Sequence, residues 1–149
     1  MKKIIITLAL ILVCSSSSAN ENVFTTLDGQ TINYEKLLSS SKTVFFFWTT
    51  WCPTCVREMQ YINSVYTDFS KVNIIYINGG QNSNQVRRFI ESKSINQDIQ
   101  KKIILDGNLL LAKKFSVFAI PTFIFFKNGE VIYRSHYLNQ DLLAEIFDQ

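Results

Sequence analysis

Histidine and cysteine are scarce in this chain, whose 149 residues include one histidine and three cysteines. A structural zinc site takes four protein ligands, mostly cysteine and histidine. Only Cys52 and Cys55 lie close together in the sequence, because Cys14 belongs to the N-terminal apolar segment and His136 lies near the C-terminus. The ligand count argues against zinc as the reason for the cysteine pair, and we expect no metal site. His136 is expected to be a surface histidine outside the functional site.

Basic residues are not in large excess either, since 15 lysines and arginines stand against 12 acidic residues. The basic pairs are dispersed along the chain, whereas binding to a nucleic-acid backbone requires a clustered basic surface. We therefore expect no nucleic-acid partner. A glycine-rich phosphate loop is also lacking, because Gly79-Gly80 has neither a following Lys-Ser/Thr nor the G-x-G-x-x-G spacing.

The N-terminal apolar run, residues 4–13, is only ten residues long, whereas a membrane-spanning helix needs about 20. Two lysines precede the run, and small polar residues ending in Ala19 follow it, which is the layout of a secretory signal peptide. We expect residues 1–19 to be removed after Ala19 and residues 20–149 to form one exported, periplasmic or otherwise extracytoplasmic domain. In the alternative of lipoprotein processing, Cys14 would be acylated and would tether the protein to the membrane.

The pattern of apolar residues after this segment predicts an α/β domain with a central mixed β-sheet flanked by helices. Residues 23–33 alternate around Asp28-Gly29 and predict an N-terminal β-hairpin extension. Alternation of strands and helices in the first half requires parallel crossovers, and a late hairpin through Asn128-Gly129 adds antiparallel strands. We expect the other strands at 43–48, 72–78 and 102–108 and within 120–135, helices at 34–40, 53–69, 84–93, 109–115 and from 139 or 141 onward, and no clear element at 94–101.

The two cysteines follow an aromatic strand, in the stretch FFFWTTWCPTC. The strand is expected to end near Thr49, which places Cys52 at or beside the N-cap of the next helix, with Pro53 in the first turn. A thiolate there faces unpaired backbone N–H groups and the positive end of the helix dipole, so the pKa of Cys52 should be lowered. Cys55 follows one turn later on the same face, within bonding reach. We expect its thiol to be the more buried one and the sulfur of Cys52 to be accessible to water.

A bridge between Cys52 and Cys55 would close a very short loop, so it would add little stability through chain entropy. A pair with this spacing is better suited to reversible oxidation than to stapling the fold. We assign Cys52 as the nucleophile that forms a mixed disulfide with a partner and Cys55 as the resolving thiol. No cofactor is expected, because thiolate exchange supplies the whole reaction. The alternative is an inert structural bridge of the kind found in exported proteins.

Two separated motifs carry a resemblance to a known family. FWTTWCPTC resembles the active-site segment of the thioredoxin superfamily, and AIPTFIFFKNGEVIY resembles its cis-proline strand and hairpin. The exported character, the N-terminal hairpin and the sequence CVREM resemble the TlpA/ResA-like branch of bacterial thiol-disulfide oxidoreductases. The similarity covers residues 23 to 149 and implies a thioredoxin-like fold.

The resemblance also implies a substrate-binding surface beside Cys52. Pro121 would be preceded by a cis peptide bond, and Ile120 would present its backbone to a bound peptide. Trp51 and Pro53 would contribute apolar contacts to the partner. Taken from the residues alone, an ordinary trans proline at 121 and a semi-exposed packing role for Trp51 remain open.

Glu58 lies three positions after Cys55, where the resembling branch has a glutamate that assists proton transfer at the resolving cysteine. A partly buried carboxylate with a raised pKa could take the thiol proton of Cys55. A solvated helix glutamate is the alternative, because spacing alone does not establish burial. Thioredoxin itself has a buried aspartate where this chain has Phe46, so Glu58 is the only carboxylate candidate.

These features predict an exported enzyme that exchanges electrons with protein thiols and disulfides through Cys52 and Cys55. The resemblance favours a protein-disulfide reductase, for cysteines of apocytochrome c or of copper-site proteins, that is itself reduced by a membrane electron donor. A disulfide oxidant or isomerase remains an alternative within the same class. A lipid-tethered binding module on the same fold is the alternative from another class.

Overall fold

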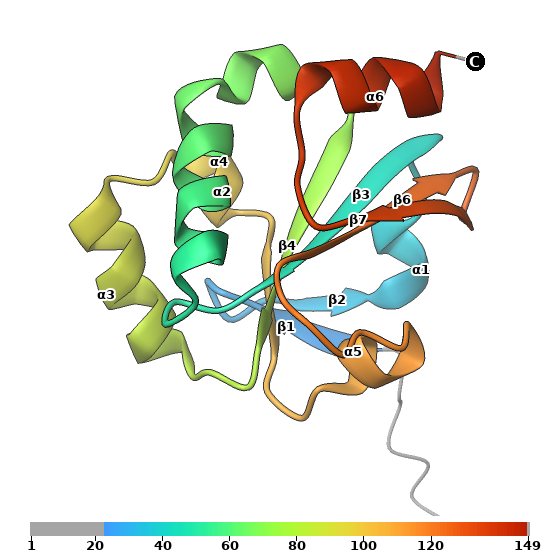
Figure 1. Cartoon of the computed structure of the whole chain (residues 1–149). Helices are drawn as coiled ribbons and strands as arrows, with labels where there is room; N and C mark the ends of the chain where they lie inside the picture. The colour runs from blue at the N-terminus through green and yellow to red at the C-terminus, as the bar shows by residue number, and fades with distance from the viewer. Residues whose placement is uncertain (1–22, 149) are drawn as a thin grey trace, which may run out of the picture.

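The computed structural model describes residues 23–148, which form a seven-stranded mixed β-sheet with helices on both faces (Figure 1). The segment 1–19, with Cys14, lies outside the described residues, so signal cleavage and lipid attachment stay predictions. In chain order the elements are β1 (Val23–Thr26), β2 (Thr31–Asn33), α1 (Tyr34–Leu37), β3 (Lys42–Trp48), α2 (Pro53–Ser64), the 3₁₀ helix η1 (Tyr66–Phe69), β4 (Asn73–Gly79), α3 (Ser83–Lys93), α4 (Gln97–Gln100), β5 (Ile103–Asp106), α5 (Leu110–Lys114), β6 (Thr122–Lys127), β7 (Glu130–Ser135) and α6 (Gln140–Phe147).

The strand order is β2-β1-β5-β4-β3-β6-β7, which confirms the expected α/β architecture. The strands β3, β4 and β5 are parallel, as the alternating first half of the sequence predicted, and β6 joins β3 antiparallel. The expected hairpin of β1 and β2 is also confirmed, and β1 attaches it to β5. Gly29 in the hairpin turn has a φ of +84°, a conformation that glycine adopts without steric penalty.

Strand β3 lies inside the sheet between β4 and β6, and its residues from Thr43 to Trp48 are all buried. Successive side chains of a strand point to opposite faces, so this strand supplies two cores. Phe46 and Trp48 pack with α2, α3 and α6 on one face, while Phe45 and Phe47 pack with α1 and α5 on the other. Both faces are covered, which is why the strand is a continuous apolar run rather than an alternating one.

Helix α2 ends at Ser64, five residues before the predicted end at residue 69, and a 3₁₀ turn follows it. The Ser64 hydroxyl donates a 2.7 Å hydrogen bond to the carbonyl of Tyr61, which also accepts from the N–H of Val65. Serine side chains compete in this way for the carbonyls of the last helical turn. A second difference is the short helix α4, which forms within residues 94–101, where no clear element was expected.

Asp106 fixes the start of helix α5. The residue is only 2% exposed, and its carboxylate accepts the N–H of Leu111 at 3.2 Å and that of Ala112 at 3.0 Å. Replacing it with alanine leaves the buried N–H of Leu111 and the partly buried N–H of Ala112 without their partner, and a buried group without a partner costs about 1–3 kcal/mol. We expect Asp106→Ala to lower the free energy of unfolding by about 2–4 kcal/mol in urea titrations.

A matched control for this variant is Asp68→Ala, at an exposed aspartate in η1. Surface substitutions of this kind stay within about 0.5 kcal/mol. A loss no larger in Asp106→Ala than in the control would show that the carboxylate does not hold α5.

Candidate active site

Cys52 is the N-cap of helix α2, as the sequence predicted. Its backbone is extended, with φ −89° and ψ 109°, and its Sγ accepts the backbone N–H of Cys55 at 3.2 Å. Pro53 occupies the first helical turn, where its missing N–H removes no helical hydrogen bond. A sulfur in this place receives an N–H hydrogen bond and faces the positive end of a twelve-residue helix. Both interactions favour the thiolate over the thiol.

Cys52 and Cys55 are joined in a disulfide, with their Cα atoms 5.2 Å apart. Cys55 is completely buried, and Cys52 is 6% exposed. Cys55 is therefore the more buried cysteine, as expected, but Cys52 is far less accessible to water than the sequence analysis predicted. The physical reason is that its sulfur is enclosed by the bond to Cys55, by the helix start and by the Ile120 carbonyl oxygen, which lies 4.0 Å away.

The loop before strand β6 supplies the other side of the site. The Ile120–Pro121 peptide bond is cis, the isomer that the family resemblance implied. Pro121 is buried. Ile120 is half-buried, and its carbonyl points toward the Cys52 sulfur. On the side of the helix, Trp51 is 70% exposed and Pro53 is also exposed. The structure thus places the four predicted substrate-binding residues on the two segments that flank the disulfide.

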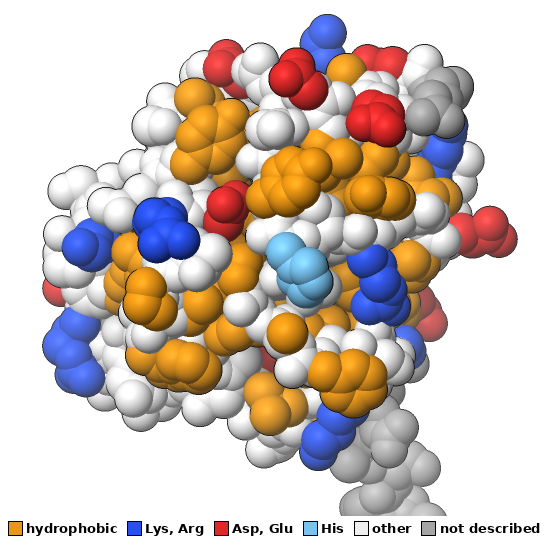
Figure 2. Space-filling view, in the orientation of Figure 1, with side chains coloured by type: hydrophobic (Ala, Val, Ile, Leu, Met, Phe, Trp, Pro, Cys, Tyr) orange, Lys and Arg blue, Asp and Glu red, His pale blue; other side chains and the backbone are white. Residues whose placement is uncertain are grey.

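His136 is exposed, but it lies closer to this site than the sequence predicted. Its Nδ1 donates a 2.7 Å hydrogen bond to the carbonyl of Pro121, across 15 positions of the sequence. In Figure 2 the single histidine, in pale blue, lies between groups of hydrophobic side chains on the same face of the molecule. The contact holds the segment after strand β7 against the proline loop.

Glu58 is half-buried on helix α2, one turn beyond Cys55. Its Oε2 accepts the backbone N–H of Leu138 at 3.3 Å, in the segment that leads to helix α6. Burial raises the pKa of the Glu58 carboxyl, while the Leu138 hydrogen bond and the charge of Arg57 act in the opposite direction. The Glu58 side chain is thus partly buried. Of the two alternatives left open by the sequence, it is closer to the partly buried carboxylate than to the solvated one.

A raised pKa gives a specific expectation for Glu58→Gln. The amide can keep the Leu138 hydrogen bond, but it cannot accept the Cys55 proton. Starting from a preformed mixed disulfide on Cys52, we expect the release of the partner by Cys55 to slow by roughly tenfold to a hundredfold. In the wild type this rate should fall as the pH drops through the raised pKa of Glu58, and the variant should lack that part of the pH profile.

The free energy of unfolding should also depend on the protonation of Glu58. It should fall as the pH rises, whereas the release rate should rise with pH. Because the folded-state pKa of Glu58 is raised, its stabilising contribution is complete below the unfolded-state pKa and is lost as the pH rises through the folded-state value. Glu91→Gln, at an exposed glutamate of α3, is the control. It should leave the pH dependence of the release rate and that of the free energy of unfolding unchanged. An unchanged pH profile in Glu58→Gln would remove Glu58 from the proton transfer.

Gln81 is a site residue that the sequence analysis missed. The side chain is only 8% exposed, and its Oε1 accepts the backbone N–H of Thr50 at 2.8 Å while its Nε2 donates to the Thr50 hydroxyl at 2.8 Å. The Nδ2 of Asn78 donates to the same oxygen at 3.1 Å. These hydrogen bonds hold the loop that carries Trp51 and Cys52. The segment GGQNSN indicated only a turn, because nothing local shows that Gln81 reaches a residue 31 positions earlier.

Within residues 23–148, no group of three or more histidine, cysteine, aspartate or glutamate side chains is placed to hold a metal ion. In the same described range, no helix is both long enough and apolar enough to cross a bilayer.

Comparison with known proteins places the chain in a family. A family model described as Redoxin matches residues 15–141. The thiol-disulfide oxidoreductase ResA of Geobacillus kaustophilus is 35% identical over 125 residues, which are 80% of this chain and 67% of that relative. The crystal structure of StoA from Bacillus subtilis has a TM-score of 0.66 at 26% identity and covers 83% of this chain and 92% of its own.

A third similar protein supports the fold alone. It is a secreted disulfide oxidoreductase of Mycobacterium tuberculosis, homologous to DsbE of E. coli, with a TM-score of 0.68 at 20% identity, over 83% of this chain and 91% of that chain. A thioredoxin-like fold with a C-x-x-C disulfide at the start of a helix defines the class of thiol-disulfide oxidoreductases. The chain belongs to the redoxin family, and its relatives there are the ResA-like thiol-disulfide oxidoreductases.

Proposed function

We propose that the protein is a reductase of disulfides in other proteins, with Cys52 and Cys55 cycling between dithiol and disulfide. The observation that carries the proposal is the position of Sγ of Cys52, which caps helix α2 and accepts the Cys55 N–H at 3.2 Å. An N–H hydrogen bond and the positive end of a helix stabilise a thiolate in this position, and the thiolate is the species that attacks disulfides. The choice of reduction over oxidation follows the likeness to ResA.

The proposed cycle starts from the reduced protein. The Cys52 thiolate attacks one sulfur of the partner's disulfide, and the other partner sulfur leaves as a thiolate. Cys55 then loses its proton to Glu58 and attacks the Cys52 sulfur, which releases the second partner thiolate and forms the Cys52–Cys55 disulfide. The partner gains two electrons and the protein loses two, so a thiol donor must reduce the pair again.

The partner would bind along the surface formed by Trp51, Pro53 and Ile120, next to the buried Pro121. The backbone of Ile120 is well placed for this because its carbonyl lies 4.0 Å from the attacking sulfur. A peptide that pairs with this backbone would bring its own sulfur next to Cys52. Such main-chain pairing gives affinity without requiring one particular sequence.

The setting of the reaction is also part of the proposal. Residues 1–19 would direct export, and residues 20–149 would act in the periplasm or an equivalent compartment. The substrates would be cysteines of apocytochrome c or of copper-site proteins, and a membrane protein of the thiol-reductase type would supply electrons. Contact with the membrane surface would arise if Cys14 were acylated.

A redox titration against glutathione tests the direction. Reductases such as thioredoxin have potentials near about −270 mV, whereas the oxidant DsbA lies near about −120 mV. We expect a midpoint more negative than about −200 mV for the Cys52–Cys55 pair. A midpoint potential near that of DsbA would contradict the reductase proposal and support the alternative that the protein is a disulfide oxidant.

Trapping of partners tests the roles of the two sulfurs. In cells that produce Cys55→Ser, mixed disulfides with partners should accumulate because nothing resolves them, and Cys52→Ser should trap none. The trapped partners can then be identified directly. A Cys52→Ser variant that kept full biological activity would instead support a binding module on this fold.

A further inference from the structure

Strands β6 and β7 stop pairing at the edge of the active site. The last residues that pair there are Phe123 and Ser135, and Pro121 lies two positions before this end of the ladder. Proline cannot donate a ladder hydrogen bond, because it has no backbone N–H. Its carbonyl oxygen still requires a donor, because an unpaired backbone carbonyl that is shielded from water costs free energy.

The side chain of His136 supplies this donor. Nδ1 of the imidazole lies 2.7 Å from the carbonyl oxygen of Pro121. The next backbone N–H, that of Tyr137, donates instead to the hydroxyl of Ser135 at 3.2 Å. The imidazole thus extends the contact between the two chain segments beyond the end of the strand ladder.

The acceptor determines which nitrogen of the His136 ring carries the hydrogen of this bond. A carbonyl oxygen has no hydrogen to donate, so the hydrogen lies on Nδ1. In the neutral ring Nε2 is then the nitrogen without a hydrogen. The imidazolium ring also carries a hydrogen on Nδ1, so the bond to Pro121 persists in both charge states.

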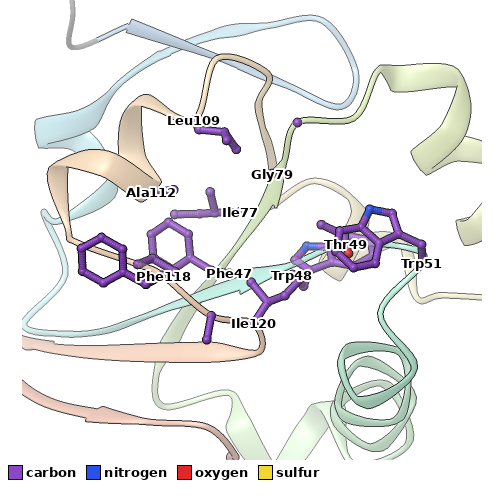
Figure 3. A pocket seen from close by; sticks show the side chains of 13 residues that line it. Phe47, Trp48, Thr49, Trp51, Ile77, Gly79, Leu109, Ala112, Phe118 and Ile120 are labelled. Carbon is purple, nitrogen blue, oxygen red and sulfur yellow. The ribbon is translucent and has the colours of Figure 1, made fainter.

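The Pro121 carbonyl belongs to the loop that faces the reactive sulfur. Figure 3 shows Ile120 on the turn before β6, in a pocket that it lines together with the end of β3. Its carbonyl lies 4.0 Å from Sγ of Cys52. The Thr122 hydroxyl donates to the carbonyl of Ala119 at 2.7 Å and closes the loop over residues 119–122. Because Ile120 and Pro121 share a peptide bond, a displacement of the Pro121 carbonyl would also move the backbone of Ile120.

The other end of the histidine contact is anchored to helix α2. Leu138, two residues after His136, is only 2% exposed and belongs to the same core cluster as Cys52 and Cys55. Its N–H donates to Oε2 of Glu58 on α2 at 3.3 Å. The segment 136–138 therefore links the helix that carries both cysteines to the proline loop on the other side of the disulfide.

We propose that His136 is a positioning residue for disulfide exchange, whose Nδ1–H holds the Pro121 carbonyl and thereby orients the Ile120 backbone toward a partner bound at Cys52. The inference rests on the proposed exchange with protein disulfides and adds a residue to the surface that binds the partner. His136 acts through the proline loop, so its removal should weaken the binding of a peptide partner and leave the sulfur steps unchanged.

Nuclear magnetic resonance tests the hydrogen bond without reference to activity. The chain contains a single histidine, so the full-length protein made with isotope-labelled histidine gives the signals of this ring alone. Two-bond proton–nitrogen correlation spectra distinguish a hydrogen on Nδ1 from one on Nε2. At a pH where the ring is neutral, we expect the hydrogen on Nδ1. A hydrogen on Nε2 would overturn the proposal.

Exchange kinetics test the consequence for partner binding. The prereduced protein is mixed with increasing concentrations of a glutathione-capped cysteine peptide, and the released thiol is measured. We expect His136→Leu to raise the half-saturating concentration about fivefold and to keep the maximal rate within about twofold. His136→Asn should restore most of the binding, because its amide nitrogen can donate from nearly the same place as Nδ1.

A small aromatic disulfide that has no peptide backbone serves as the control substrate. Its rate should be the same in the wild type, His136→Leu and His136→Asn, because it does not pair with Ile120. An unchanged half-saturating concentration in His136→Leu, or equal losses in the two variants, would overturn the positioning role while exchange itself continued. A wild type that exchanged with neither substrate would overturn the proposed function and the role of His136 with it.

Discussion

Replacing Cys52 with serine is expected to lower the rate of disulfide exchange by at least about a thousandfold, the scale on which removal of a catalytic nucleophile acts. A hydroxyl at the N-cap can accept the same N–H hydrogen bond, so the helix and the fold should persist. It is not ionised near neutral pH, and it does not form a bond to sulfur by exchange. The measurement is the rate at which the prereduced protein releases thiol from a glutathione-capped peptide.

Cys55→Ser provides the matched control, because it removes a sulfur one turn away and leaves the first attack intact. This variant should release one thiol at a rate close to that of the wild type and then stop as a stable mixed disulfide. The reverse pattern, with attack surviving in Cys52→Ser and lost in Cys55→Ser, would exchange the two assigned roles. The complete burial of Cys55 and the small exposed fraction of Cys52 argue against that reversal.

Local signals account for the parts of the fold that the sequence predicted well. The continuous apolar run of β3 indicated a strand covered on both faces, and the turn at Asn128-Gly129 indicated the β6–β7 hairpin. The N-cap position of Cys52 followed from the end of that run and from Pro53. Each of these features depends on neighbours within a few residues, where propensity and periodicity carry information.

Contacts between distant segments account for most of what was missed. Gln81 reaches Thr50 across 31 positions, His136 reaches Pro121 across 15, and Glu58 reaches Leu138 across 80. The enclosure of Cys52 arises in the same way, since Ile120 is 68 positions away from it. No pattern along the chain encodes which loop covers which helix start.

The last prediction concerns Phe46, which stands where thioredoxin has a buried aspartate. Its side chain is fully buried in the centre of the sheet and stacks on Phe123, with ring centroids 4.4 Å apart and planes 10° from parallel. It also contacts Tyr76 and Trp48, at centroid distances of 6.1 and 6.4 Å. We expect Phe46→Ala to lower the free energy of unfolding by about 3–5 kcal/mol, because it removes a large ring and leaves a cavity in a close-packed layer. Urea titrations of the oxidised protein measure the loss.

Two other substitutions make the interpretation of Phe46→Ala specific. Phe46→Leu should cost less, since most of the volume remains, and Tyr137→Ala, at a side chain that is 51% exposed, should stay within about 0.5 kcal/mol. If Phe46→Ala lost no more stability than Tyr137→Ala, the ring contacts of Phe46 with Phe123, Tyr76 and Trp48 would not stabilise the fold. The expected result assigns Phe46 to the hydrophobic core between the sheet and its helices. A phenylalanine at position 46 cannot accept a proton, so in the proposed cycle Glu58 is the carboxylate that would take the proton of Cys55.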